Sequence, residues 1–86
     1  MTTAKDTVET AKGIDKLNNV RRAWAADRGY VIVGFDGYGD GVMGSVTNTM
    51  QIANYRLVDA DDDWLVEGKE CVTLHFAHED REDLIK

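Results

Sequence analysis

Residues 35–41, with the sequence Phe-Asp-Gly-Tyr-Gly-Asp-Gly, form a loop of glycines and aspartates that could bind a cation. The loop follows the apolar run 30–35 directly, and five of the eight glycines lie between positions 34 and 44. Glycine adopts positive φ without steric cost, so this concentration indicates an unusual backbone geometry. The carboxylates of Asp36 and Asp40 could hold a cation, present charge to a partner or solvate a sharp turn. The residues leave these alternatives open.

Known cation loops match this segment only in part. On an EF-hand loop that starts at Asp36, the residues Asp36, Asp40 and Gly41 agree with the first, fifth and sixth positions. Tyr38 occupies the third position, and Thr47 replaces the bidentate glutamate at the last. We therefore expect no metal and no cofactor, with an irregular calcium site at Asp36 and Asp40 as the weaker alternative. A phosphate loop fits worse, because two carboxylates would repel the ligand.

Cys71, His75 and His78 have side chains that bind zinc, but their spacing opposes a shared ion. If residues 71–76 form a strand, Cys71 and His75 stand about 13 Å apart on one face, too far for one ion. Cys71 is the only cysteine, which excludes an internal disulfide and fits a reducing compartment. The chain pairs no histidine with a plausible nucleophile and orienting acid. We expect no enzymatic activity and no catalytic residue.

The N-terminal third carries the pattern of an amphipathic helix. Residues 3–6 have the form of a capping box, and Ile14, Leu17, Val20 and Trp24 recur at spacings of three and four. This pattern predicts helix as far as position 28. The glycine at position 13 is expected to break or kink it, which would leave residues 1–12 loosely attached.

The rest of the chain predicts antiparallel strands. Residues 43–53 alternate, with Val46, Met50 and Ile52 on one side, and a hairpin is expected around Gly68-Lys69. The acidic run 59–63 is expected to be a polar turn, and residues 78–86 a short tail or helix. The predicted strands are residues 30–35, 43–53, 55–58, 64–67 and 71–76.

These elements predict a single α+β domain over residues 1–86. The N-terminal amphipathic helix should pack on one face of a three- to five-stranded antiparallel sheet, because each has an apolar side that needs a partner. Trp24 and Trp64 are expected as the two halves of this helix–sheet core. The other predicted core residues are Leu17, Val20, Val31, Val33, Leu65, Val72 and Leu74.

The net charge of −6 is distributed unevenly. Residues 1–34 hold six basic and four acidic side chains, whereas residues 35–86 hold four basic and twelve acidic ones. An acidic surface repels phosphates, so we expect no direct binding of nucleic acid and a basic protein as partner. The sequence has no transmembrane run and no secretory signal at its start, which predicts a cytoplasmic protein without membrane contact.

The segment 31–40 resembles a group of short, uncharacterised bacterial and phage proteins in which a strand runs into Phe-Asp-Gly-x-Gly-Asp-Ser-Gly. A second similarity to this group covers residues 72–76 and Arg81, and together the two cover about a quarter of the chain. The chain departs from the group at Gly41-Val42, and the group implies no activity. In size, acidity and low cysteine content the protein is also similar to phage-encoded inhibitors such as anti-CRISPR proteins. This similarity implies a viral protein acting in the host cytoplasm.

Three functional interpretations follow. The first is an acidic interaction module, monomeric or homodimeric, that imitates nucleic acid and occupies the nucleic-acid site of a basic host protein. The alternative is a ligand- or cation-binding accessory domain centred on residues 36–41. A domain whose acidity only keeps it soluble is a third reading. The residues predicted to contact the partner are Asp36, Tyr38, Asp40, Asp59, Asp61, Asp62, Asp63, Glu67 and Glu70.

Overall fold

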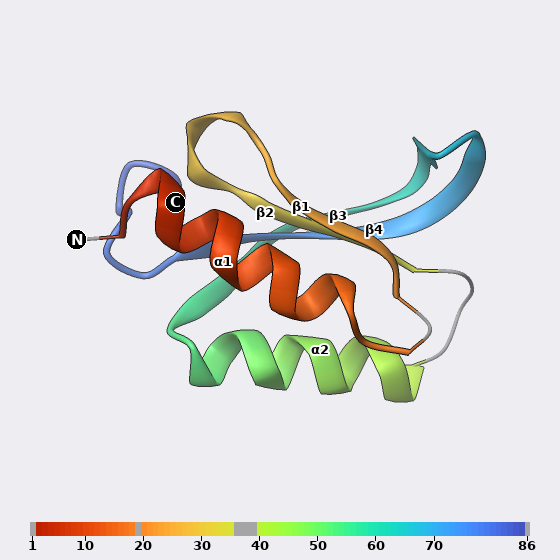
Figure 1. Cartoon of the computed structure of the whole chain (residues 1–86), viewed down its shortest axis with the longest axis horizontal. Helices are drawn as coiled ribbons and strands as arrows, with labels where there is room; N and C mark the ends of the chain where they lie inside the picture. The colour runs from red at the N-terminus through yellow and green to blue at the C-terminus, as the bar shows by residue number, and fades with distance from the viewer. Residues whose placement is uncertain (1, 19, 36–39, 86) are drawn as a thin grey trace.

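The computed structural model describes residues 2–18, 20–35 and 40–85. It has an α+β fold, with two helices on one side of a four-stranded antiparallel sheet (Figure 1). The strand order is β1-β2-β4-β3, so β1 and β3 are the edges. The predicted N-terminal helix on an antiparallel sheet is confirmed. The elements are α1 (Ala4–Asp15), β1 (Val20–Ala25), the 3-10 turn η1 (Asp27–Gly29), β2 (Val31–Phe35), α2 (Asp40–Ile52), β3 (Tyr55–Val66) and β4 (Lys69–His78).

The predicted capping box opens helix α1. The Thr3 hydroxyl accepts from the Asp6 backbone N–H at 3.2 Å, and the Asp6 carboxylate accepts from the Thr3 backbone N–H at 2.9 Å. Thr7, Ala11 and Ile14 repeat at one helix face and are buried against the sheet. The helix runs through position 13 and ends at Asp15, so residues 4–12 belong to the packed layer.

The predicted continuation of this helix to position 28 is wrong, because residues 20–25 form strand β1. The register shifts between Val20 and Arg22, and this irregularity lets both Val20 and Ala23 be buried. A spacing of three therefore arises here from a bulged strand rather than from a helix. The Asp15 carboxylate accepts from the Ala23 backbone N–H at 2.8 Å and ties the helix end to this strand. Leu17, predicted to be core, lies in the connecting turn and is 42% exposed.

The predicted strand over residues 43–53 is also wrong, because this segment belongs to helix α2. Val46 and Met50 are buried four positions apart, whereas Ile52 is exposed. Polar residues between these positions, including Thr47 and Thr49, completed the alternation expected of a strand, but the two threonine hydroxyls form hydrogen bonds within the helix. Thr47 and Thr49 each donate to the backbone carbonyl four residues earlier, at 2.8 and 2.9 Å.

The acidic run 59–63 lies within the long strand β3 and is not a turn. Pairing with β4 shifts register between Leu57 and Asp59 and again between Asp61 and Trp64. These two irregularities let a charged segment follow the sheet edge. The predicted hairpin is confirmed, with its turn at Glu67 and Gly68, both at positive φ. In the described part of the tail, residues 79–85 form turns rather than a helix.

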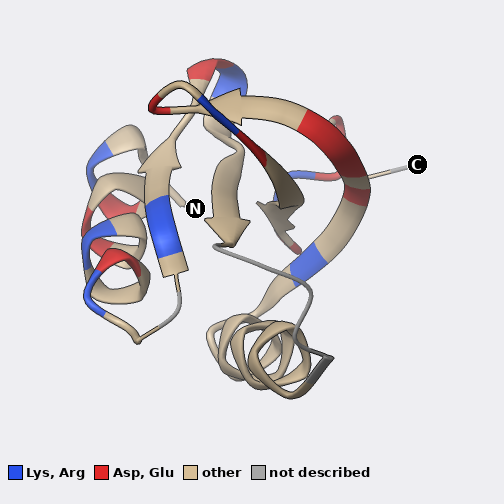
Figure 2. Cartoon of the chain, turned by 90° about the vertical axis from the view of Figure 1, so that its right-hand side faces the viewer, with Lys and Arg blue, Asp and Glu red and all other residues tan. Residues whose placement is uncertain are grey.

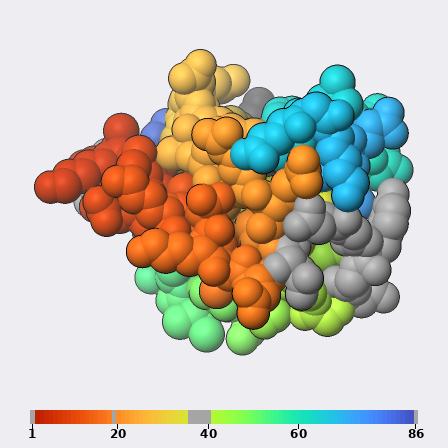
Figure 3. Space-filling model, turned by 45° about the vertical axis from the view of Figure 1, so that its right-hand side comes forward, coloured from red at the N-terminus to blue at the C-terminus, as the bar shows by residue number. Residues whose placement is uncertain are grey.

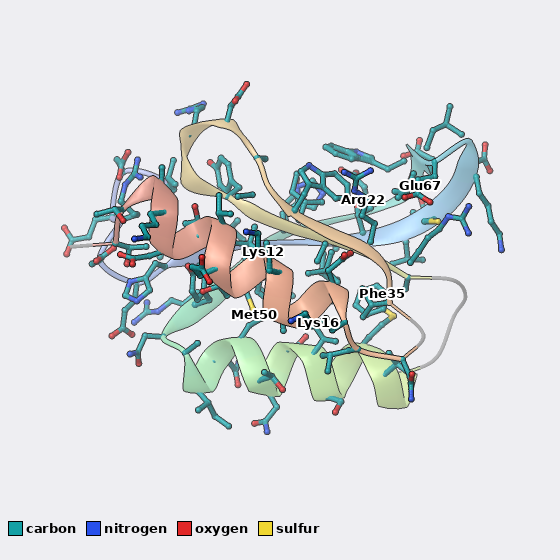
Figure 4. All side chains as sticks on the ribbon, in the orientation of Figure 1. Lys12, Lys16, Arg22, Phe35, Met50 and Glu67 are labelled. Carbon is teal, nitrogen blue, oxygen red and sulfur yellow. The ribbon has the colours of Figure 1, made fainter. Side chains whose placement is uncertain are left out.

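The core lies between the helices and the sheet, and Figure 4 shows Met50 and Phe35 within it. The predicted core positions Val20, Val31, Val33 and Leu74 are confirmed, and Val72 is buried as well. Leu65 is 71% exposed, so its predicted burial is wrong. No helix among the described residues has both the length and the apolar content to span a membrane. The core residues are Ala11, Ile14, Val20, Ala23, Val31, Val33, Phe35, Val46, Met50, Tyr55, Leu74 and Phe76.

Candidate functional site

The sheet face turned away from the helices, here called the outer face, carries two rows of residues aligned by strand register. Residues opposite one another in neighbouring strands point to the same side. Because Val31, Val33 and Phe35 point into the core, the residues between them point outward. From β1 to β3, one row is Trp24, Ile32, His75 and Asp59, and the other is Arg22, Gly34, Thr73 and Asp61.

Both tryptophans belong to this side of the molecule, so their predicted place in the helix–sheet core is wrong. Trp24 is half-buried in β1, opposite Ile32. Trp64 is exposed, and its ring meets the edge of the His75 ring with centroids 4.7 Å apart. The apolar spacing in the sequence did not distinguish the two sheet faces.

The β3–β4 hairpin bends over one end of the outer face (Figure 2). Val66 is buried directly above Gly34, where an added Cβ would lie 3.1 Å from Val66 Cγ2. The Arg21 Nε–H donates to the Val66 carbonyl at 3.1 Å, and the hairpin lies against β1 in the space-filling view (Figure 3). The hairpin thus forms a wall beside the outer face.

A hollow of about 530 Å³ opens on the outer face. Its lining combines acidic, aromatic and basic side chains from β3, β4, η1 and the C-terminal tail. The tail reaches this position because Leu84 is buried beside Gly29. The lining residues are Arg28, Tyr30, Val58, Asp59, Asp61, Trp64, His75, Asp83 and Leu84.

His75 is the least exposed polar residue of the hollow, at 9%. Its Nε2 atom lies 3.0 Å from the hydroxyl of Thr73, which is fully buried, and 3.8 Å from Asp61 Oδ2. One donor atom from each of Asp59, Asp61 and His75 lies within 4.8 Å of the other two. Two carboxylates and an imidazole thus converge on one point at the sheet surface.

The structure places the predicted partner-binding residues in two groups. Asp36 and Tyr38 lie outside the described residues, and Asp40 begins helix α2 with a side chain that is not described. The predicted calcium alternative therefore also lies outside the described side chains. The remaining six lie together on the β3–β4 hairpin, where all but the half-buried Asp61 are exposed (Figure 2). They are Asp59, Asp61, Asp62, Asp63, Glu67 and Glu70.

The sequence interpretation missed the meeting of Asp59 and Asp61 with His75. It compared His75 with Cys71 and with His78, whose ring contacts Tyr55 on the core side of the sheet. A usable signal was present. Extending the hairpin pairing of residues 64 and 71 back along both strands in regular register brings residues 60–62 opposite 73–75, one residue from the observed pairing. The error was to end the strand at the acidic run.

Comparison with known proteins gives no relative for the chain. Searches against protein-family models, curated proteins and solved structures found no match. The functional argument therefore depends on the geometry and charge of the outer face and its hairpin.

Proposed function

We propose that the protein is a small acidic interaction module that binds a basic, nucleic-acid-handling protein and occupies its nucleic-acid site. The observation that supports this most directly is the position of the acidic run on β3, an exposed edge strand. By its similarity to phage-encoded inhibitors, the module acts in a host cytoplasm and by binding rather than by catalysis.

The carboxylates of the acidic run do little for the fold itself. Within the described part of the chain, Asp62 and Asp63 form no ion pair, and Asp61 pairs only with His75. Neighbouring like charges repel, so the run costs some stability. Opposite charge on a partner would offset this cost and speed association.

Exposed apolar side chains stand next to these carboxylates. Leu65 and Trp64 follow the run directly and are both exposed. Tryptophan is enriched among the residues that contribute most to protein interfaces. Charged, bulged edge strands disfavour strand addition by another chain. We therefore expect the partner to contact the side chains of β3 rather than to extend the sheet.

Two lysines lie away from the acidic hairpin, whereas Arg22 pairs with its Glu67 and Lys69 belongs to it. Lys12 and Lys16, labelled in Figure 4, belong to α1 and to the turn that follows it, in the helical layer. Neutralising them offers a control that changes net charge without touching the hairpin.

The test is displacement of fluorescent DNA or RNA from purified nucleic-acid-binding proteins, with CRISPR effector complexes first. The protein should displace the nucleic acid without binding it, and the affinity should fall as salt rises, since charges are screened beyond about 8 Å at 0.15 M. Replacing Asp61, Asp62 and Asp63 by Asn should slow association more than it speeds dissociation. Replacing Lys12 and Lys16 by Gln should have less effect.

Two results would contradict this function. One is direct binding of the protein to nucleic acid. The other is a partner affinity that changes neither with salt nor with the triple Asn substitution. The cation-binding alternative on residues 36–41 is not tested by the structure, because residues 36–39 and the Asp40 side chain are not described.

A further inference from the structure

We propose that Asp59, Asp61 and His75 form a binding site for one divalent transition-metal ion, with Zn²⁺ as the representative ion. The site goes beyond the proposed docking function and does not depend on it, because an ion can be tested without any partner. The evidence is the convergence of the three donor atoms within 4.8 Å in an accessible hollow.

The donor spacing is close to what a bound ion requires. Zinc lies about 2.0–2.2 Å from nitrogen and oxygen ligands, which places two ligands of a tetrahedral ion about 3.3–3.5 Å apart. His75 Nε2 and Asp61 Oδ2 are 3.8 Å apart, longer than a hydrogen bond. A small inward rotation of the two aspartates would complete the triangle. Both have room to rotate, since Asp59 is exposed and Asp61 half-buried.

The imidazole is held in place before any ion arrives. The His75 ring is nine-tenths buried and contacts the Trp64 ring, and the Thr73 hydroxyl lies beside Nε2. Binding at Nε2 requires the tautomer with the proton on Nδ1 and rotation of the Thr73 side chain about its Cα–Cβ bond, which moves the hydroxyl away and leaves the ring in place. A ligand fixed by its surroundings loses little conformational freedom on binding.

The ligand types select the class of ion. One imidazole nitrogen with two carboxylates suits zinc and its neighbours in the transition series, whereas Ca²⁺ and Mg²⁺ prefer oxygen ligands alone. Asp62 and Asp63 add negative charge nearby. Arg28 and Asp83, also in the lining, carry opposite charges. The rest of the ion's coordination sphere would face the hollow.

The test is calorimetric titration of the purified full chain with Zn²⁺ at neutral pH, compared with Mg²⁺ and Ca²⁺. We expect one Zn²⁺ per chain, bound about tenfold or more tightly than either hard cation. Asp61→Asn and His75→Gln should each weaken Zn²⁺ binding about tenfold or more, because even outer-shell partners contribute that much. Thr73→Val, which removes the competing hydrogen bond, should retain or tighten binding.

Two control variants distinguish a specific Zn²⁺ site from nonspecific attraction of Zn²⁺ to the acidic surface. Replacing Asp62 and Asp63 by Asn removes two charges next to the site but none of its ligands, and His78→Gln removes the other histidine. Both should bind Zn²⁺ within about threefold of the parent, because neither variant removes a donor atom and the exposed charges of Asp62 and Asp63 are screened by solvent and salt. Circular dichroism of each metal-free variant establishes that it is folded.

A second readout uses the ring contact. Co²⁺ bound at the site should quench fluorescence from Trp64, and Trp64→Phe should remove most of this quenching. The proposal is overturned if the parent binds no Zn²⁺, if folded His75→Gln binds it equally well, or if the Asp62 and Asp63 variant loses as much affinity as the ligand variants. Adding a chelator to the displacement test keeps it independent of either metal result.

Discussion

Thr2 and Asp80, 78 positions apart in the chain, are joined by two hydrogen bonds to a single carboxylate oxygen. The backbone N–H and the hydroxyl of Thr2 both donate to Asp80 Oδ2. The other oxygen, Asp80 Oδ1, lies 3.1 Å from His78 Nδ1. This contact fastens the residues before α1 to the turn after β4.

The Asp80 contact predicts loss of stability in acid. Partial burial raises the pKa of Asp80, but the hydrogen bonds from the Thr2 backbone and hydroxyl, together with His78, outweigh it and hold this pKa below its ordinary value of 3.8. Stability from Asp80 is therefore fully present above pH 3.8 and is lost as the pH falls through the folded-state pKa. Asp80→Asn should lower Tm at pH 7 and should make Tm fall less steeply below pH 4. The control Asp62→Asn should change neither Tm at pH 7 nor its dependence on pH. The role of Asp80 is contradicted if Tm of Asp80→Asn and of the parent fall equally in acid.

Two residues of α2 give a matched test of the core. Met50 is fully buried, and Ile52, two positions later, is 76% exposed. Met50→Ala should cost about 2–5 kcal/mol of unfolding free energy, because it leaves a cavity between the helix and the sheet. Ile52→Ala should change this free energy by about 0.5 kcal/mol or less. Denaturant unfolding of both variants measures the difference, and similar midpoints would show that α2 does not pack as described.

Substitutions at Gly34 and Val66 should have non-additive effects on stability, because the two residues share the same packing space. An added Cβ at Gly34 would lie 3.1 Å from Val66 Cγ2, so Gly34→Val should cost about 1–3 kcal/mol by overpacking. Val66→Ala should recover part of this cost in the double variant, although alone it leaves a void. A double-mutant cycle from chemical denaturation measures the coupling energy. Strict additivity would indicate that the hairpin does not close over Gly34.

Two glycines should respond to alanine with opposite signs. Gly13 lies within α1 with open space around its missing side chain, so Gly13→Ala should stabilise the protein by about 0.5–1 kcal/mol. Gly68 has a φ of +83° at the hairpin turn, so Gly68→Ala should destabilise it by about 1 kcal/mol. Thermal unfolding of the two variants measures both effects; shifts in the same direction would contradict the assigned backbone conformations.

The sequence predicted well the elements that local signals specify. The capping box at Thr3, the apolar strand β2 and the hairpin turn at Gly68 each depend on neighbours along the chain. The errors arose where tertiary pairing decides. The bulge near Arg22 gives β1 a helix-like spacing, and the threonines of α2 resemble those of a strand until their hydroxyls bond within the helix.

The candidate site was predicted only in part, for the same reason. Asp59 and Asp61 were expected at the surface, and they are there. Their meeting with His75 depends on the register of β3 against β4, which two irregularities shift. Charge alone predicted a turn at this segment, because aspartate is depleted in strands. Pairing with the buried strand β4 outweighs that preference.

The length of the buried segment in β4 also has a consequence for the chain before it folds. Residues 71–77 are all buried in the native state, and such an apolar, β-forming segment is prone to aggregate whenever it is exposed. The acidic run 59–63 precedes it closely in the sequence, so its charge stays near the segment even in the unfolded chain. Charged residues that flank an aggregation-prone strand act as gatekeepers, because their repulsion opposes association between chains. The carboxylates of β3 would thus protect newly made chains before any partner is present.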